Sequence, residues 1–297
     1  MRLKVMFALW TASLLAIAGA KELSVLTIGN SFADSVFGYL PKIAASAGDK
    51  IILERANIGG CPMDKHWALV EKSEVDPNLK PYYGKFTLKE KLQSRKWDVV
   101  TIQQVSSKSW QPDSFNPYAR NLYDYVKKYA PGAEVVIQQT WAYRFDDKRL
   151  AKWNIGQDEM YKRLTDAYNK AATDLKVRQI PTGDAVQLAR QTQVKPYVPY
   201  DPAVLEKLKH PDPLPSEEGS FARGFSWVKG KDGKYVIKND PAHLNKRGEY
   251  LQSCVWYGFL FNKPTSDIKF VPKEISAEDA RFLRETAQKV LDARLKK

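Results

Sequence analysis

The stretch VLTIGNSFADSV, residues 25 to 36, decides how the chain begins to fold. Its first four residues are strand formers, and the run stops at Gly29-Asn30, immediately before Ser31. Glycine and asparagine tolerate the backbone conformations that a tight exit from a strand requires. The stretch therefore predicts a buried strand whose carboxyl end presents a serine hydroxyl.

Short apolar runs alternate with amphipathic segments along the following 150 residues. This order predicts an α/β fold with a parallel central sheet of about five strands and helices on both faces. The predicted strands are Leu23–Ile28, Ile51–Ala56, Asp98–Gln103, Glu134–Gln139 and Val177–Pro181. The helices predicted between them are Val36–Ala47, Leu88–Arg95, Pro117–Tyr129 and Asp158–Leu175, and two more are predicted after residue 243 and residue 276.

The first twenty residues have the pattern of an export signal. Two basic residues precede an apolar core, and Ala18-Gly19-Ala20 resembles a cleavage site. We expect a periplasmic or secreted protein whose residues 21–297 form a single domain. An irregular insertion rich in proline and charge is predicted around residues 191–238, with a hairpin turn at Asp232-Gly233.

The formal net charge is +13, but the basic residues are scattered among acidic ones. Such a distribution is typical of solvated helix surfaces and would also suit an anionic polymer. No nucleic-acid-binding motif, apolar stretch for stable membrane insertion, or metal-ligand spacing is present, so no nucleic-acid partner, metal or cofactor is predicted. Cys61 and Cys254 could form a disulfide or remain two buried thiols. The sequence predicts no particular oligomeric state.

A serine hydroxyl becomes a useful nucleophile only when a base lies against it. Of the three histidines, His66, His210 and His243, the last lies three residues after Asp240, in NDPAHLNKRGEYL. We expect this pair in a loop that turns into a helix, with Asp240 orienting the ring of His243 toward Ser31. Without other evidence, an isolated Asp-x-x-His pattern is explained more simply by Asp240 capping the helix predicted after residue 243.

These two blocks resemble a known family. TIGNSFADS near the front and DPAHLNKRGEYL near the end are similar to the first and last blocks of the SGNH (GDSL-type) serine hydrolases, with alternating βα units between them. The resemblance implies a flavodoxin-like three-layer α/β/α sandwich that hydrolyses esters. It also implies that Ser31 is the nucleophile, His243 the base and Asp240 its orienting acid, with the Ser31 amide in the oxyanion hole.

The other two donors of the SGNH oxyanion hole correspond less closely to residues of this chain. The superfamily uses a glycine after the second strand, and Gly59-Gly60 supplies one, with Gly60 preferred. The asparagine expected after the third strand is absent, and the chain has Gln103-Gln104 instead. A branch known as a domain of unknown function is similar in carrying glutamine there. We therefore place Gln103 in the hole, with Gln104 in reserve; Asn30, Gly59, His66 and Gln104 are the further candidates for the pocket wall.

The sequence thus predicts an exported serine esterase that removes acetyl or similar O-acyl groups from carbohydrate. Trp141, Trp227 and Tyr197 are candidates for stacking on a sugar. One alternative is a carbohydrate-binding or scaffold protein with a degraded site, which the missing asparagine favours. Another is a hydrolase of lipid or thioester acyl groups, which would need a long apolar groove.

Overall fold

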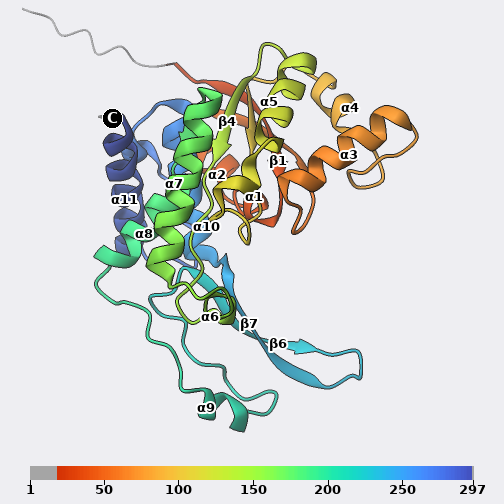
Figure 1. Cartoon of the computed structure of the whole chain (residues 1–297). Coiled ribbons are helices and arrows are strands. Elements are labelled where there is room, and N and C mark those ends of the chain that lie inside the picture. Colours follow the sequence, from red (N-terminus) through yellow and green to blue (C-terminus); the bar gives the residue numbers. More distant parts are fainter. Residues whose placement is uncertain (1–18, 296–297) are drawn as a thin grey trace, which may run out of the picture.

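A parallel sheet of five strands forms the centre of the protein, whose computed structural model describes residues 19 to 295 (Figure 1). The order is β2-β1-β3-β4-β5, and every neighbouring pair is parallel. This is the doubly wound order of flavodoxin-like folds, so the predicted fold class is confirmed. The strands are β1 (Glu22–Gly29), β2 (Lys50–Asn57), β3 (Val99–Ile102), β4 (Glu134–Gln138) and β5 (Gln179–Ile180).

Helices cover both faces of this sheet. One layer contains α2 (Leu40–Ser46), α8 (Thr182–Thr192), α10 (Lys246–Phe261) and α11 (Ala277–Leu295), which contact one another. The opposite layer contains α3 (Met63–Val75), α4 (Leu88–Gln93), α5 (Tyr118–Tyr129) and α7 (Gln157–Leu175). Nearly every residue of α10 is buried, because this helix is apolar on all sides and packs against α2, α8 and α11. The segment that follows His243 is therefore part of the core.

Several helices differ from the sequence prediction. The helix expected at 36–47 begins only at Leu40, because residues 35–39 form turns and Pro41 suits a first helical turn. Helices α3 and α8 were not predicted. Each buries a narrow set of mostly small or polar residues, so its apolar periodicity is weak.

The insertion contains an antiparallel hairpin, β6 (Ala222–Lys229) and β7 (Tyr235–Leu244), which we call the hairpin arm. The predicted turn is present, with Gly233 at φ +82°. Residues 193–221 before it contain the short helix α9 (Pro202–Lys207) and otherwise little regular structure. Figure 1 shows the arm and α9 extending away from the sheet and its helices.

The two cysteines are buried and free, so the disulfide alternative is wrong and the two-thiol alternative is correct. Burial raises the pKa of Cys61 to about 11 and that of Cys254 to about 12. The predicted export segment lies almost wholly outside the described residues. Within residues 19–295, no helix is long and apolar enough to cross a membrane. The same range contains no cluster of three or more His, Cys, Asp or Glu side chains able to hold a metal ion.

Close packing at the start of α8 yields a test of the fold. A Cβ atom on Gly183 would lie 2.1 Å from the carbonyl oxygen of Thr140, just beyond β4, whereas one on Gly132 would meet nothing within 4 Å. We expect Gly183→Ala to lower the free energy of unfolding by about 3 kcal/mol, since two buried segments must separate. The matched Gly132→Ala should change it by less than about 0.5 kcal/mol. Urea denaturation measures both, and equal stabilities would contradict this packing.

Candidate active site

Ser31 lies at the carboxyl edge of the sheet, where β1 ends and the short helix α1 (Ser31–Asp34) begins. Asn30 shapes this exit: its side chain accepts from the Phe32 amide at 3.1 Å and donates to the Cys61 carbonyl at 3.3 Å. Gly29 is required immediately before it, because a Cβ there would lie 2.5 Å from Oε1 of Gln103. The Gly-Asn-Ser sequence therefore fixes the direction in which the serine leaves the strand.

His243 reaches Ser31 from the far end of the chain. Its Nε2 lies 2.9 Å from the Ser31 Oγ, and its Nδ1 lies 2.9 and 3.0 Å from the two carboxylate oxygens of Asp240. A carboxylate only accepts, so Nδ1 carries the proton and Nε2 is free to accept from the serine hydroxyl. The structure thus brings the three residues into one hydrogen-bonded chain that is open to solvent, with the His243 side chain 30% exposed.

Asp240 is held in its charged form. Burial raises the pKa of its carboxyl, but hydrogen bonds from the His243 side chain and from the backbone amides of His243 and Ala242 outweigh this effect and lower the pKa to about 2. The carboxylate is therefore negative throughout the neutral range. It can fix the His243 tautomer and stabilise an imidazolium if one forms.

The local structure around this pair differs from our expectation. Asp240 and His243 lie in the last residues of strand β7 and not in a loop that turns into a helix. Helix α10 begins later, at Lys246, because Asn245 is its cap and accepts from the Gly248 amide at 3.0 Å. Pro241 lies inside this strand end, where the register of the hairpin is irregular.

The segment after β4 holds the end of β7 in place. Trp141 is buried and donates from Nε1 to the Ala242 carbonyl at 2.8 Å. Phe32 stacks on Trp141 at 4.2 Å between ring centres and meets the His243 ring edge-on at 5.2 Å. The candidate role of Trp141 in sugar stacking is therefore wrong, because no face of its ring is free. Its position instead aligns the histidine.

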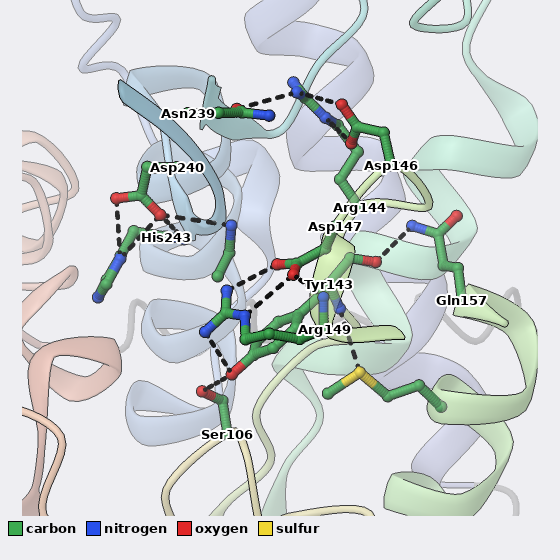
Figure 2. Close-up of polar contacts among 12 residues, drawn as sticks. Ser106, Tyr143, Arg144, Asp146, Asp147, Arg149, Gln157, Asn239, Asp240 and His243 are labelled. Carbon is green, nitrogen blue, oxygen red and sulfur yellow. Dashed lines mark hydrogen bonds and ion pairs between the residues drawn. The ribbon is translucent and has the colours of Figure 1, made fainter. Parts of the chain in front are cut away.

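Arg144 provides a second anchor beside the site (Figure 2). Its amide donates to the Pro241 carbonyl at 3.0 Å. Its guanidinium is almost fully buried, stacks on Tyr197 and bonds to residues of the insertion and the hairpin arm. The side-chain acceptors are Asp146, Glu217, Ser220 and Asn239. Tyr197 is consequently buried beneath Arg144 and does not offer a ring to a sugar.

The two glutamines after β3 have different environments. Gln103 is 1% exposed; its Oε1 accepts from the Asn30 amide at 3.4 Å, while its Nε2 has no hydrogen-bond partner among the described residues. The Nε2 of Gln104 donates to the carbonyl and hydroxyl of Ser114. Its Oε1 accepts from the amides of Met63 and Val105. Gln104 is therefore a structural brace, and its reserve role is wrong. Gln103 alone retains a buried donor next to the serine turn.

Gly59 and Gly60 form an exposed turn after β2. The Cys61 amide closes this turn on the Ile58 carbonyl at 3.0 Å, and Gly60 has a φ of +64°. Neither glycine amide donates to another group within residues 19–295. Asn30 connects the turn to the serine segment through the Cys61 carbonyl. Both amides thus remain available, and Gly60 occupies the conformation that requires glycine.

His66 does not line an open pocket, contrary to expectation. It is fully buried, with Nε2 2.8 Å from the Gly29 carbonyl and Nδ1 2.9 Å from the Tyr82 hydroxyl. Nε2 must carry the proton, since a carbonyl only accepts, so Nδ1 accepts from Tyr82. Burial is the main cause that lowers the pKa of His66, to about 4. A neutral His66 thus supports the serine turn from below.

Sequence reasoning missed a polar cluster that lies near Asp240 (Figure 2). The hydroxyls of Ser106 and Tyr143 lie 2.8 Å apart, and Arg149 stacks on the Tyr143 ring at 4.0 Å. Hydrogen bonding to Asp147 is the main cause that raises the pKa of Arg149, and the charge of Asp240 adds to it. Ser106 and Tyr143 follow β3 and β4, so their position after strand ends was the available signal. Arg149 lies in α6 (Lys148–Trp153) and had none.

Comparison with known proteins places this arrangement in context. A model described as "Domain of unknown function (DUF4886)" matches residues 24–200. The chain belongs to the DUF4886 family. A DUF4886 protein from Bacteroides uniformis is similar in structure, with 23% identity, coverage of 91% of this chain and 95% of that one, and a TM-score of 0.68. No curated protein matches this DUF4886 chain.

A candidate SGNH hydrolase from Slackia heliotrinireducens is also similar, with 18% identity, coverage of 80% of this chain and 99% of that one, and a TM-score of 0.50. The DUF4886 protein therefore has a three-layer α/β fold like that of the SGNH hydrolases, so the fold that the resemblance implied is confirmed. Asp240 and His243 lie beyond the residues that the family model matches.

The buried His66 gives a pH-dependent stability. Because its pKa is about 4 in the folded protein and near 6.5 when unfolded, the unfolded chain takes up the proton first as the pH falls. We expect the free energy of unfolding to decrease from about pH 6.5 toward pH 4 by up to about 1.4 kcal/mol per pH unit from this group. Urea denaturation across this range measures the slope. His66→Gln should remove that component, and an unchanged slope in the variant would contradict this prediction.

Proposed function

We propose that this DUF4886 protein is a serine ester hydrolase. The observation that supports this most directly is the chain of contacts in which Ser31 Oγ lies 2.9 Å from His243 Nε2 while His243 Nδ1 is bonded to Asp240. This geometry matches the requirements for activating a serine: a base within hydrogen-bond reach and a carboxylate that orients the base. The likeness of fold to SGNH hydrolases agrees with the proposal but does not specify a reaction.

In the proposed reaction, Ser31 attacks the acyl carbon as its proton passes to Nε2 of His243. The carbonyl oxygen becomes an oxyanion, which accepts from the amides of Ser31 and Gly60 and from Nε2 of Gln103. The bond to the leaving alcohol breaks as His243 returns the proton to its oxygen. Water then attacks the acyl-enzyme with His243 again accepting a proton, which releases the carboxylic acid and restores Ser31.

Gln103 is the residue through which this site differs from the usual SGNH pattern. Its Nε2 is buried and unpartnered among the described residues, and an unused buried donor costs about 1–3 kcal/mol. Because Nε2 is closed to solvent in the structure, substrate binding would have to open a path to it before a developing oxyanion could supply the missing acceptor. Other buried side-chain atoms also lack partners, so it is the place of this donor next to the serine turn that supports the catalytic proposal over a degraded binding site.

For the substrate we propose an O-acyl group, such as acetyl, on a carbohydrate. The open position of His243 suits an ester that projects from a larger molecule, and the charged insertion beside it does not suit a long lipid chain. We also propose that residues 1–20 direct export to the periplasm or the medium. A non-catalytic carbohydrate-binding protein and a lipid or thioester hydrolase remain the alternative outcomes of the tests below.

The serine can be tested directly with a fluorophosphonate probe. We expect covalent labelling of the wild type and none of Ser31→Ala, because the probe needs an activated hydroxyl. Turnover of 4-nitrophenyl acetate should fall at least about 10,000-fold in Ser31→Ala with an unchanged melting temperature. An unlabelled wild type would support the binding protein, and faster turnover of long-chain than short-chain aryl esters would support the lipid hydrolase.

Gln103 can be tested by removing its donor and keeping its shape. In Gln103→Glu the carboxylate still accepts from Asn30 but donates nothing to an oxyanion, and Gln103→Met supplies neither function. We expect kcat to fall about 100- to 1,000-fold in both variants, with a small change in KM, because the interaction forms mainly in the transition state. Steady-state kinetics and a melting curve separate this effect from unfolding. Retention of kcat within about threefold would assign the hole to other donors.

A further inference from the structure

The hairpin arm has one face covered by the protein and one face that is not. Side chains alternate along a strand, so the paired residues Trp227 and Ile237 lie on one face. The preceding segment packs on that face: the ring of His210 stacks on Tyr235 at 3.7 Å, and Trp227 donates from Nε1 to the Asp212 carbonyl at 2.9 Å. Trp227 and Tyr235 therefore both contact His210 of this segment, although Tyr235 remains 44% exposed.

The opposite face is open and leads to the candidate active site. It carries the pairs Val228–Val236 and Ser226–Lys238. The two valines are 39% and 54% exposed, which is unusual for a facing apolar pair. Asp240 lies two residues beyond Lys238 on β7, so its side chain belongs to this same face. The uncovered face is thus continuous with the residues around Ser31.

The hairpin arm carries mainly positive charge. Its acidic residues are Asp232 and Asp240, and the latter is bonded to His243. Its basic residues are Arg223, Lys229, Lys231, Lys234 and Lys238. Across the part of the chain that the structure describes, the four lysines form no ion pair, whereas Arg223 approaches Glu249. The lysines near the tip and on the open face are free to meet an external anion.

We propose that the open face of the hairpin arm binds an acidic polysaccharide and guides it to Ser31. The valine pair offers apolar contact to sugar rings, and Lys238 on this face and Lys234, just before β7 at the arm's tip, offer positive charge to their carboxylates. From Lys234, the residue before β7, to Asp240 the extended chain spans about 20 Å at about 3.3 Å per residue, which is longer than one sugar ring. The inference rests on the proposed esterase, since it names the polymer that carries the ester.

Nucleic acid fits this surface less well. Single-stranded nucleic acids are bound by aromatic rings on which bases stack, together with positive charge. The arm's Trp227 and Tyr235 contact His210 on the covered face, and the open face presents valine, serine and lysine. The side chains of the open face therefore favour a polysaccharide over a single-stranded nucleic acid.

Binding can be measured without catalysis, using full-length Ser31→Ala protein. We expect polygalacturonate to bind and dextran, which is neutral, not to bind, with an affinity that falls steeply as salt is added. Lys234→Gln/Lys238→Gln should weaken binding about fivefold. The control Lys209→Gln/Lys229→Gln removes the same charge from the preceding segment and from the face that carries Tyr235, and should change binding less than twofold. Equal losses in the two double variants, or tighter binding of oligothymidylate than of polygalacturonate, would overturn the proposal.

Turnover separates this proposal from that of the esterase. In the wild type, the KM for acetyl groups on pectin should be lower than that on neutral acetylated glucomannan. Lys234→Gln/Lys238→Gln should raise the ratio of KM for pectin to KM for 4-nitrophenyl acetate about fivefold. If the wild type hydrolyses no ester, the proposed function fails while the binding result still stands. If the wild type hydrolyses pectin, glucomannan and 4-nitrophenyl acetate equally, and the double variant leaves the KM ratio unchanged, the arm proposal alone fails.

Discussion

The contact between Ser31 and His243 joins two segments that are 212 residues apart in the chain. A single hydrogen bond contributes only about 1 kcal/mol net, so it cannot hold those segments together by itself. Their meeting depends on buried packing instead. β1 lies inside the sheet between β2 and β3, and helix α10, which follows His243, is buried on nearly all sides. Packing in the core therefore holds both segments in position, and the polar contact adds only a small further stabilisation.

Around this contact, the protein uses buried polar groups to set backbone directions. His66 and the Ile58 amide both donate to the Gly29 carbonyl, and Gln103 accepts from the Asn30 amide. Trp141 and Arg144 fix the carbonyls of Ala242 and Pro241 in the same way. Because buried polar groups are costly when unpaired, such bonds favour one arrangement over its alternatives. The serine and the histidine are thus oriented from opposite sides by groups that need never touch a substrate.

The same packing explains why the hairpin arm matters to the site. Its strand β7 ends in Asp240 and His243, so any movement of the arm relative to the sheet would disturb the histidine. Arg144 resists such movement, because its buried guanidinium bonds both to the insertion and to Asn239 of the arm. Strand β7 thereby connects the exposed basic surface of the arm to the candidate active site.

Sequence reasoning identified the parallel sheet, the serine turn and the Asp-x-x-His pair, because each depends on local patterns of residues. It placed Asp240 and His243 in a loop that turns into a helix, because their three-residue spacing before an apolar helix suits such a loop. Only long-range pairing with β6 makes the segment a strand. It could not separate Gln103 from Gln104, because adjacent residues at a strand end point to different sides and the register is set by neighbours. It also treated His66 and Trp141 as candidates for contact with a substrate, since the type of a residue does not show whether its side chain is buried.

The sequence by itself determined the five strands of the sheet, the serine turn after the first of them and the kinds of side chain available for chemistry. Only the tertiary structure decided which of those side chains meet. It paired Ser31 with His243, left one amide of Gln103 without a partner and buried the aromatic residues that a sugar was expected to contact. The physical reason is that residue patterns act over a few positions, whereas burial and hydrogen-bond partners depend on segments that are distant in the chain.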